Sequence, residues 1–159
     1  MGCDPGLAGA IAYVSGGKLE QVYDMPVLEL SRNRKSKREL DLRELARMIA
    51  DGPLPSVAYI EQVGAMPGQG VSSMFAFGKC VGGILGVIST LGITIHSVAP
   101  LTWKRFHRID KNSGKDASRA AAKNLFPPAS GLFARVKDDG RAEAALIAAY
   151  GAQAERIIK

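Results

Sequence analysis

The sequence is short of the residues that build disulfide-bonded or zinc-binding proteins. Cys3 and Cys80 are the only cysteines, and neither lies in a Cys-x-x-Cys motif or close to a histidine. This usage argues against a disulfide framework and against a zinc site. We therefore expect two buried free thiols in a protein of a reducing compartment, the cytoplasm.

Long hydrophobic runs are also scarce. No signal peptide is visible at the start of the sequence, and the longest apolar run, Val81 to Ile95, is rich in glycine. A run of this length is too short to cross a bilayer. We expect a soluble protein with no membrane partner.

Acidic residues are outnumbered by basic ones. The 159 residues include 21 Lys and Arg against 15 Asp and Glu, which gives a net charge of +6 and a pI of about 9.5. A chain of this length with 47% hydrophobic residues can form one domain with its own core, but not two. The positive charge favours a polyanionic partner and says nothing about the fold.

The opening stretch, Gly2 to Gly9, places a single carboxylate between two apolar segments. Asp4 is followed by Pro5 and Gly6, which turn the chain, and then by the strand-like run 10–14. An Asp in this position would point off the sheet beside a glycine-rich turn with room for a phosphate or a metal. The alternative is an Asx-turn or a helix cap, which Asp-Pro-Gly forms readily.

The rest of the chain alternates between strand and helix patterns. Residues 1–25 predict three consecutive antiparallel strands, and further strands are expected at 56–61 and 92–98. Five helices are expected. One begins at Asp41, one covers 71–91, one begins at Pro100, one spans 116–125, and the last begins near Asp138 and ends the chain.

The segment at about 29–40 is predicted to be a basic flexible loop. Five of the seven residues from Arg32 to Arg38 are basic, and none of the seven is apolar. Such a stretch is usually a solvated loop. On a basic protein it is also suited to contact the phosphates of a nucleic acid.

Glu61 closes a strand that is otherwise apolar. An unpaired buried carboxylate is costly, and ligands bind at the ends of parallel strands, so we favour a site over a solvated strand end. The last helix carries a second acidic signal, since Glu143 follows Asp139 by four residues and shares its helix face. Capping explains an Asp at this helix start but does not explain Glu143.

These carboxylates suggest a metal site. Oxygen ligands without cysteine or paired histidine select a hard ion such as Mg²⁺ or Mn²⁺. Two such ions can activate water and stabilise the leaving oxygen in phosphodiester hydrolysis. Between Lys104 and Lys123 seven basic residues surround aromatic side chains, as in a groove that follows a nucleic-acid backbone.

The helix at 71–91 contains an unusual number of glycines. Gly78, Gly82 and Gly86 recur at every fourth residue, and Gly83 lies among them. Each glycine costs about 1 kcal/mol in a helix interior, which indicates close approach by another backbone. Packing against the domain's own sheet and contact with a second copy of the helix both remain open.

The order of these elements resembles the RNase H-like fold, and more narrowly the RuvC-type Holliday junction resolvases of phages and bacteria. The motifs that match are Gly2–Gly9, Ile60–Val63, Phe77–Gly83 and Asp139–Ala144, and the resemblance covers essentially the whole chain. It implies an α/β fold with a five-stranded mixed sheet flanked by helices, in a single domain over 1–159. It also implies a homodimer that cuts symmetric strands of a four-way junction.

The resemblance assigns roles to individual residues. Asp4, Glu61, Asp139 and Glu143 would be catalytic and would hold two Mg²⁺ ions, with Mn²⁺ as a substitute. Lys104 and Lys115 fall where the family has basic residues near the scissile phosphate. The DNA-binding candidates are Arg32, Arg34, Lys35, Lys37, Arg38, Gln69, Lys79, Lys104, Arg105 and Lys115.

One departure from the family concerns the last motif. The family often ends with Asp-x-x-Asp, whereas here the spacing is four and the last acid is Glu143. The choice between Asp138 and Asp139 is therefore open, and the shared helix face favours Asp139.

Other functions fit parts of the pattern. An RNase H-like nuclease that acts on flaps or branched replication intermediates is the alternative enzyme, and a non-catalytic junction-binding protein is the alternative class. The intact carboxylates argue against the second. An actin-like or sugar-kinase ATPase would need two such domains.

Overall fold

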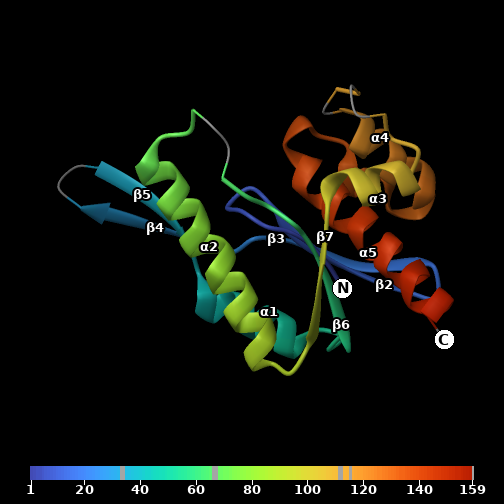
Figure 1. Ribbon diagram of the computed structural model, residues 1–159, viewed down its shortest axis with the longest axis horizontal. Helices are drawn as coiled ribbons and strands as arrows, with labels where there is room; N and C mark the ends of the chain where they lie inside the picture. The colour runs from blue at the N-terminus through green and yellow to red at the C-terminus, as the bar shows by residue number, and fades with distance from the viewer. Residues whose placement is uncertain (33–34, 66–67, 111–112, 115, 159) are drawn as a thin grey trace.

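A central mixed sheet organises the chain (Figure 1). The computed structural model describes residues 1–32, 35–65, 68–110, 113–114 and 116–158. The five strands of the sheet are β1 (Gly2–Asp4), β2 (Ala10–Ser15), β3 (Lys18–Asp24), β6 (Val57–Glu61) and β7 (Thr94–Val98), in the order β3-β2-β1-β6-β7. The first three are antiparallel, and β6 and β7 run parallel to β1. The predicted five-stranded mixed sheet flanked by helices is confirmed.

Helices cover both faces of this sheet (Figure 1). One face carries α1 (Leu42–Asp51) and α2 (Val71–Thr90). The other carries α3 (Pro100–Phe106), α4 (Asp116–Leu125) and α5 (Asp139–Ile158), with 3₁₀ segments at Pro127–Phe133 and Val136–Asp138.

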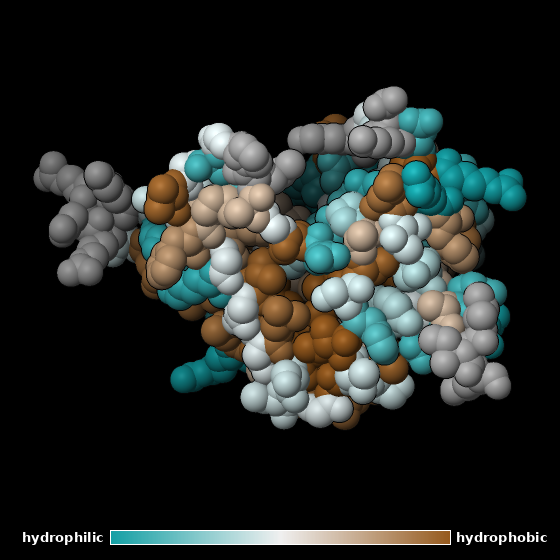
Figure 2. Space-filling model, in the orientation of Figure 1, coloured by the Kyte–Doolittle hydropathy of each residue, from teal (hydrophilic) through white to brown (hydrophobic). Residues whose placement is uncertain are grey.

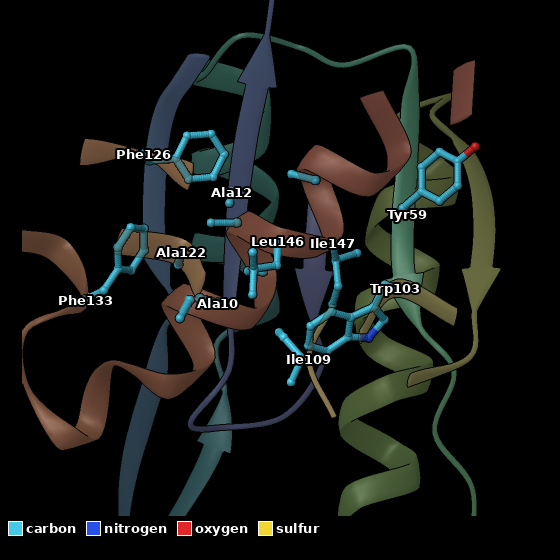
Figure 3. Close-up of a cluster of buried hydrophobic side chains, with 14 of the residues drawn as sticks. Ala10, Ala12, Tyr59, Trp103, Ile109, Ala122, Phe126, Phe133, Leu146 and Ile147 are labelled. Carbon is cyan, nitrogen blue, oxygen red and sulfur yellow. The ribbon is translucent and has the colours of Figure 1, made fainter. Parts of the chain in front are cut away.

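The two cores follow from the alternation of side chains along each strand. Ala10 and Ala12 face α5, and the intervening Ile11 faces α1 and α2. Small residues on the first face let α5 lie close to the sheet. A Cβ on Gly2 would lie 2.2 Å from the Ala148 backbone nitrogen, so β1 and α5 are in direct backbone contact. Figure 3 shows Leu146 and Ile147 of α5 beside Ala10 and Trp103 within this core.

The prediction of a basic loop at about 29–40 is wrong, because the structure has a β-hairpin there. Strands β4 (Val27–Arg32) and β5 (Lys35–Leu40) pair in antiparallel register from Val27↔Leu40 to Arg32↔Lys35. Charge density favours solvent exposure but does not exclude a two-stranded ribbon, whose faces can both be solvated. Opposite charges also face each other across the ribbon at Glu29 and Arg38, which favours this pairing.

Helix α2 packs on the sheet through one narrow stripe. Cys80, Ile84 and Ile88 are buried, and a Cβ on Gly83 would lie 2.7 Å from Leu42 of α1. Both cysteines are buried free thiols, as predicted.

The opposite side of α2 is open and largely apolar. A Cβ added at Gly78, Gly82 or Gly86 would meet no described atom within 4 Å, so these glycines point away from the sheet. Val71 and Phe75 at the start of the helix are 86% and 76% exposed. Figure 2 shows apolar and small residues along the length of α2. The expectation that no segment is long enough to cross a bilayer is wrong by length and composition, because α2 is a continuous helix of 20 residues that is apolar enough to do so.

Candidate active site

Asp4 and Glu61 end two neighbouring parallel strands. The register pairs Cys3 of β1 with Ile60 of β6, so the two acids occupy the next positions along their strands. Because Cys3 and Ile60 face α2, alternation directs Asp4 and Glu61 to the α5 face. The acids therefore lie at the carboxyl end of parallel strands, where open α/β sheets bind ligands.

The glycine-rich turn after β1 brings the start of α5 against Asp4. Gly6 has a φ of 133°, a conformation that favours glycine. A Cβ on Gly140 would lie 2.4 Å from the Ala8 carbonyl oxygen and 3.1 Å from Asp4 Oδ2. A larger residue at Gly140 would push the first turn of α5, and Glu143 with it, away from Asp4.

Glu143 joins the two strand-end acids from α5. Its Oε1 accepts a hydrogen bond of 3.0 Å from the Ser118 hydroxyl and lies 3.5 Å from Lys104 Nζ. Burial raises the pKa of Asp4 to about 8, and repulsion from Glu143 and Glu61 contributes, whereas Lys104 opposes the shift. Asp4, Glu61, Glu143 and Lys104 thus form one electrostatically coupled group, which we call the acidic cluster.

Asp139, the fourth predicted site residue, has a different partner. It starts α5 one turn before Glu143, and its Oδ1 lies 2.9 Å from Nε of Arg119 on α4. The carboxylates that repel Asp4 strongly are Glu143 and Glu61, and Asp139 is not one of them. The structure therefore brings three of the four predicted carboxylates together and pairs the fourth with an arginine.

Asp138 is held in a structural role. Its side chain is 1% exposed and accepts hydrogen bonds from the backbone nitrogen of Arg135 at 2.8 Å and from the Arg135 guanidinium at 2.7 Å. These contacts close the 3₁₀ turn before α5 and lower the pKa of Asp138. This geometry favours Asp139 over Asp138 as the site residue.

We expect Asp138→Asn and Asp139→Asn to separate stability from activity. Asp138→Asn should lower the free energy of unfolding by about 1.5–3 kcal/mol, the range for hydrogen bonds to charged groups, and should keep most cleavage activity. Asp139→Asn should lose activity by roughly 10²-fold with little change in stability. Urea unfolding and a cleavage assay check both.

The pH dependence of stability provides a control for this pair. The pKa of Asp138 is lower in the folded protein than in the unfolded chain, so its contribution is present above the ordinary value of about 4. This contribution is lost as the pH falls through the lowered pKa of Asp138 in the folded protein. Asp138→Asn should therefore make the free energy of unfolding less dependent on pH in this acidic range. Greater activity loss in Asp138→Asn than in Asp139→Asn would reverse the assignment.

The basic DNA-binding candidates lie in different parts of the molecule. Lys104 is in the acidic cluster, and Arg105 is exposed next to it on α3. Lys37 and Lys79 are exposed but both pair with Glu39, at 2.8 and 3.0 Å, which joins the hairpin to α2. Arg38 and Gln69 are exposed. Arg34 and Lys115 lie outside the described residues, as do the side chains of Arg32 and Lys35.

Sequence reasoning missed the side chains that hold the acids. Trp103 Nε1 donates to Glu61 Oε2 at 2.8 Å, and Ser118 and Arg119 of α4 contact Glu143 and Asp139. No spacing in the sequence connects these residues with their partners. The sequence indicates only that all three residues lie on helices in the basic, aromatic segment after β7.

The donor set of the acidic cluster fits a hard cation. Asp4, Glu61 and Glu143 offer carboxylate oxygens, and Lys104 lowers the pKa of Asp4 and of Glu61 against their mutual repulsion. A cation among them would favour the charged form of Asp4, whose pKa is otherwise raised. Among the residues that the structure describes, no three acidic, histidine or cysteine side chains already converge on one metal position.

Comparison with known proteins gives a relative in sequence and a clear match in fold. The chain matches no known family profile. It is 33% identical to the chloroplastic Holliday junction resolvase MOC1 of Chlamydomonas reinhardtii, over 81% of this chain and 17% of that protein. The chain thus spans about a sixth of its relative's length.

The fold matches solved RuvC structures over nearly the whole chain. Thermus thermophilus RuvC in complex with a Holliday junction substrate superposes with a TM-score of 0.62 at 14% identity, covering 96% of this chain and 94% of RuvC. Thermus thermophilus RuvC in a second structure gives a TM-score of 0.56, also at 14% identity. The predicted likeness to RuvC is confirmed in the fold, a five-stranded mixed sheet flanked by helices.

Proposed function

We propose that this chain, which shares the RuvC fold, is a structure-specific endodeoxyribonuclease that resolves four-way DNA junctions. The observation that carries the proposal is the position of Asp4 and Glu61 at the neighbouring carboxyl ends of β1 and β6, with Glu143 of α5 near enough to help raise the pKa of Asp4. The sequence relative is a Holliday junction resolvase, and one structural neighbour is bound to a junction substrate.

The acidic cluster supplies the chemistry of the proposed reaction. Asp4, Glu61 and Glu143, together with Asp139, would hold two Mg²⁺ or Mn²⁺ ions. When bound, such ions activate water and stabilise the leaving oxygen of a phosphodiester. Lys104 is 31% exposed and lies 3.5 Å from Glu143, so its ammonium can also contact the phosphate next to the site.

Symmetric cleavage requires two copies of this site. A four-way junction has two equivalent cutting points, and a two-fold dimer supplies two sites related by one axis. The open side of α2 supports this arrangement, because Gly78, Gly82 and Gly86 leave the helix backbone accessible along one stripe. We propose a homodimer joined through α2.

The buried free thiols Cys3 and Cys80 suit a reducing compartment. We propose the cytoplasm of a bacterium or of a phage-infected cell as the place of action.

A substrate comparison tests the proposal. We expect the protein to cleave a four-way junction with Mg²⁺ in preference to a flap, a fork and a linear duplex of the same sequence. Equal or faster cleavage of the flap would favour the alternative RNase H-like nuclease. Tight junction binding without cleavage would favour a non-catalytic binding protein.

We expect the basic hairpin to add electrostatic affinity without shape selectivity. Replacing Arg32, Arg34, Lys35, Lys37 and Arg38 with Ser should weaken binding to all DNA shapes. For every phosphate that the hairpin no longer neutralises, the slope of log affinity against log salt should fall by about 0.9. The total reduction should correspond to fewer than five phosphates, because Glu39 already pairs with Lys37. Binding titrations at several salt concentrations measure this.

Lys18→Ser is the matched control, since Lys18 is an exposed basic residue at the start of β3. It should leave the salt slope nearly unchanged. An unchanged slope in the five-residue variant would show that the hairpin does not contact DNA.

A further inference from the structure

Trp103 joins the hydrophobic core to the acidic cluster. It is the only tryptophan in the chain, it lies on α3, and it is fully buried. Figure 3 shows its ring next to Ile109 and Ile147, with the indole nitrogen on the side away from them. That nitrogen donates a hydrogen bond of 2.8 Å to Glu61 Oε2.

We propose that Trp103 is a positioning residue that fixes the Glu61 carboxylate toward Asp4 and Glu143, so that the acidic cluster is arranged for a divalent cation. The inference rests on the proposed function, because it assigns a task within the same site. It adds a residue from the hydrophobic core to the four acids.

The physical reason lies in the hydrogen-bonding capacity of the indole. The Nε1–H is a donor only, and a buried donor must find an acceptor. The ring of Trp103 is packed in the core and cannot rotate freely. Core packing therefore sets the direction of its N–H bond independently of Glu61. The Glu61 oxygen that accepts this bond is thereby held, and the second oxygen is directed away from the indole.

Trp103 also touches the basic member of the cluster. Lys104 Nζ lies 5.0 Å from the centroid of the Trp103 ring and 3.5 Å from Glu143 Oε1. A cation over an indole face is attracted by the ring. The same ring therefore contacts both Glu61 and Lys104, and its removal should disturb the two together.

If Trp103 only stabilised the core, loss of its N–H would not affect ion binding; if it positions Glu61, ion binding should weaken. The two roles can be tested separately because Trp103 is the single tryptophan, so an analogue that replaces tryptophan changes this side chain alone. Biosynthetic replacement of tryptophan by benzothienylalanine, which keeps the ring shape and lacks the N–H, alters only Trp103. Trp103→Phe is the genetic counterpart, and Ile109→Val, in the same core cluster, is the packing control.

Binding of Mn²⁺ measured by calorimetry is the primary readout. We expect the benzothienylalanine protein and Trp103→Phe to bind Mn²⁺ about 10–100-fold more weakly, the range for residues that orient metal ligands. Far-UV circular dichroism should stay unchanged. Ile109→Val should lose stability and keep its Mn²⁺ affinity.

The fluorescence of Trp103 gives an independent signal in the unmodified protein. Mn²⁺ should quench it saturably at the concentrations seen by calorimetry, and Glu61→Gln should shift the quenching to higher concentrations. Unchanged Mn²⁺ affinity in both Trp103 replacements would overturn the positioning role and leave the proposed function standing. Absence of any Mn²⁺ binding in the wild type would overturn the proposed function and the inference together.

Discussion

Asp4→Asn is expected to abolish junction cleavage, with a loss of about 10³-fold or more, and to leave junction binding unchanged or tighter. Asp4 is the member of the acidic cluster whose pKa is raised to about 8 by burial and by the nearby carboxylates of Glu143 and Glu61. Asparagine keeps the shape of the side chain but cannot supply a charged ligand. Where Asp4 is ionised, above its pKa of about 8 or with a metal bound, the substitution also removes a negative charge that repels the DNA phosphates. At lower pH without metal the two proteins should bind the junction alike.

Cleavage and binding must be measured on the same junction, with Mg²⁺ for cleavage and without divalent ions for binding. Glu20→Gln is the matched control, because Glu20 is an exposed acid on β3. It removes the same charge and should cleave at the wild-type rate. Full activity in Asp4→Asn would show that the site lies elsewhere.

Gly82→Leu is expected to convert the proposed α2-joined dimer into a folded monomer that no longer makes paired nicks. A Cβ at Gly82 meets no described atom within 4 Å, so the chain itself has space for a side chain there. A leucine would instead separate two helices that approach along the glycine stripe, and this would remove most of the packing between them. Sedimentation and circular dichroism measure the two parts of this result.

Gly83→Ala provides the contrast within the same helix. Its Cβ would lie 2.7 Å from the end of the Leu42 side chain, which is 44% exposed and can move aside, on the side of α2 that faces α1. This variant should therefore remain folded and dimeric, with helix propensity in its favour. A folded Gly82→Leu dimer that still cuts both strands would remove α2 from the interface.

The fold and the strand-end acids could be predicted because their signals are local. Apolar runs marked β1, β2 and β6, imperfect alternation marked β3, and a carboxylate at the end of an apolar strand stood out at Glu61. The spacing of Asp139 and Glu143 likewise depends only on helix geometry.

The remaining features depend on contacts between distant segments. The hairpin was missed because the charges of 32–38 outweigh any strand pattern, and pairing with 27–32 becomes evident only in three dimensions. Asp138 and Asp139 can both cap a helix, and the sequence favours Asp139 only through the face it shares with Glu143. The contacts with Arg135 and Arg119 that separate their roles appear only in three dimensions. The bond from Trp103 to Glu61 spans 42 residues and has no local signature.

Mapping the nicks on a four-way junction tests the central claim most directly. We predict that the wild-type protein with Mg²⁺ makes two nicks at symmetry-related positions, that ligase seals the products, and that chelation of the metal stops the reaction. A junction that is bound but stays uncut, or that is cut equally well without divalent ions, would contradict metal-dependent resolution by the acidic cluster.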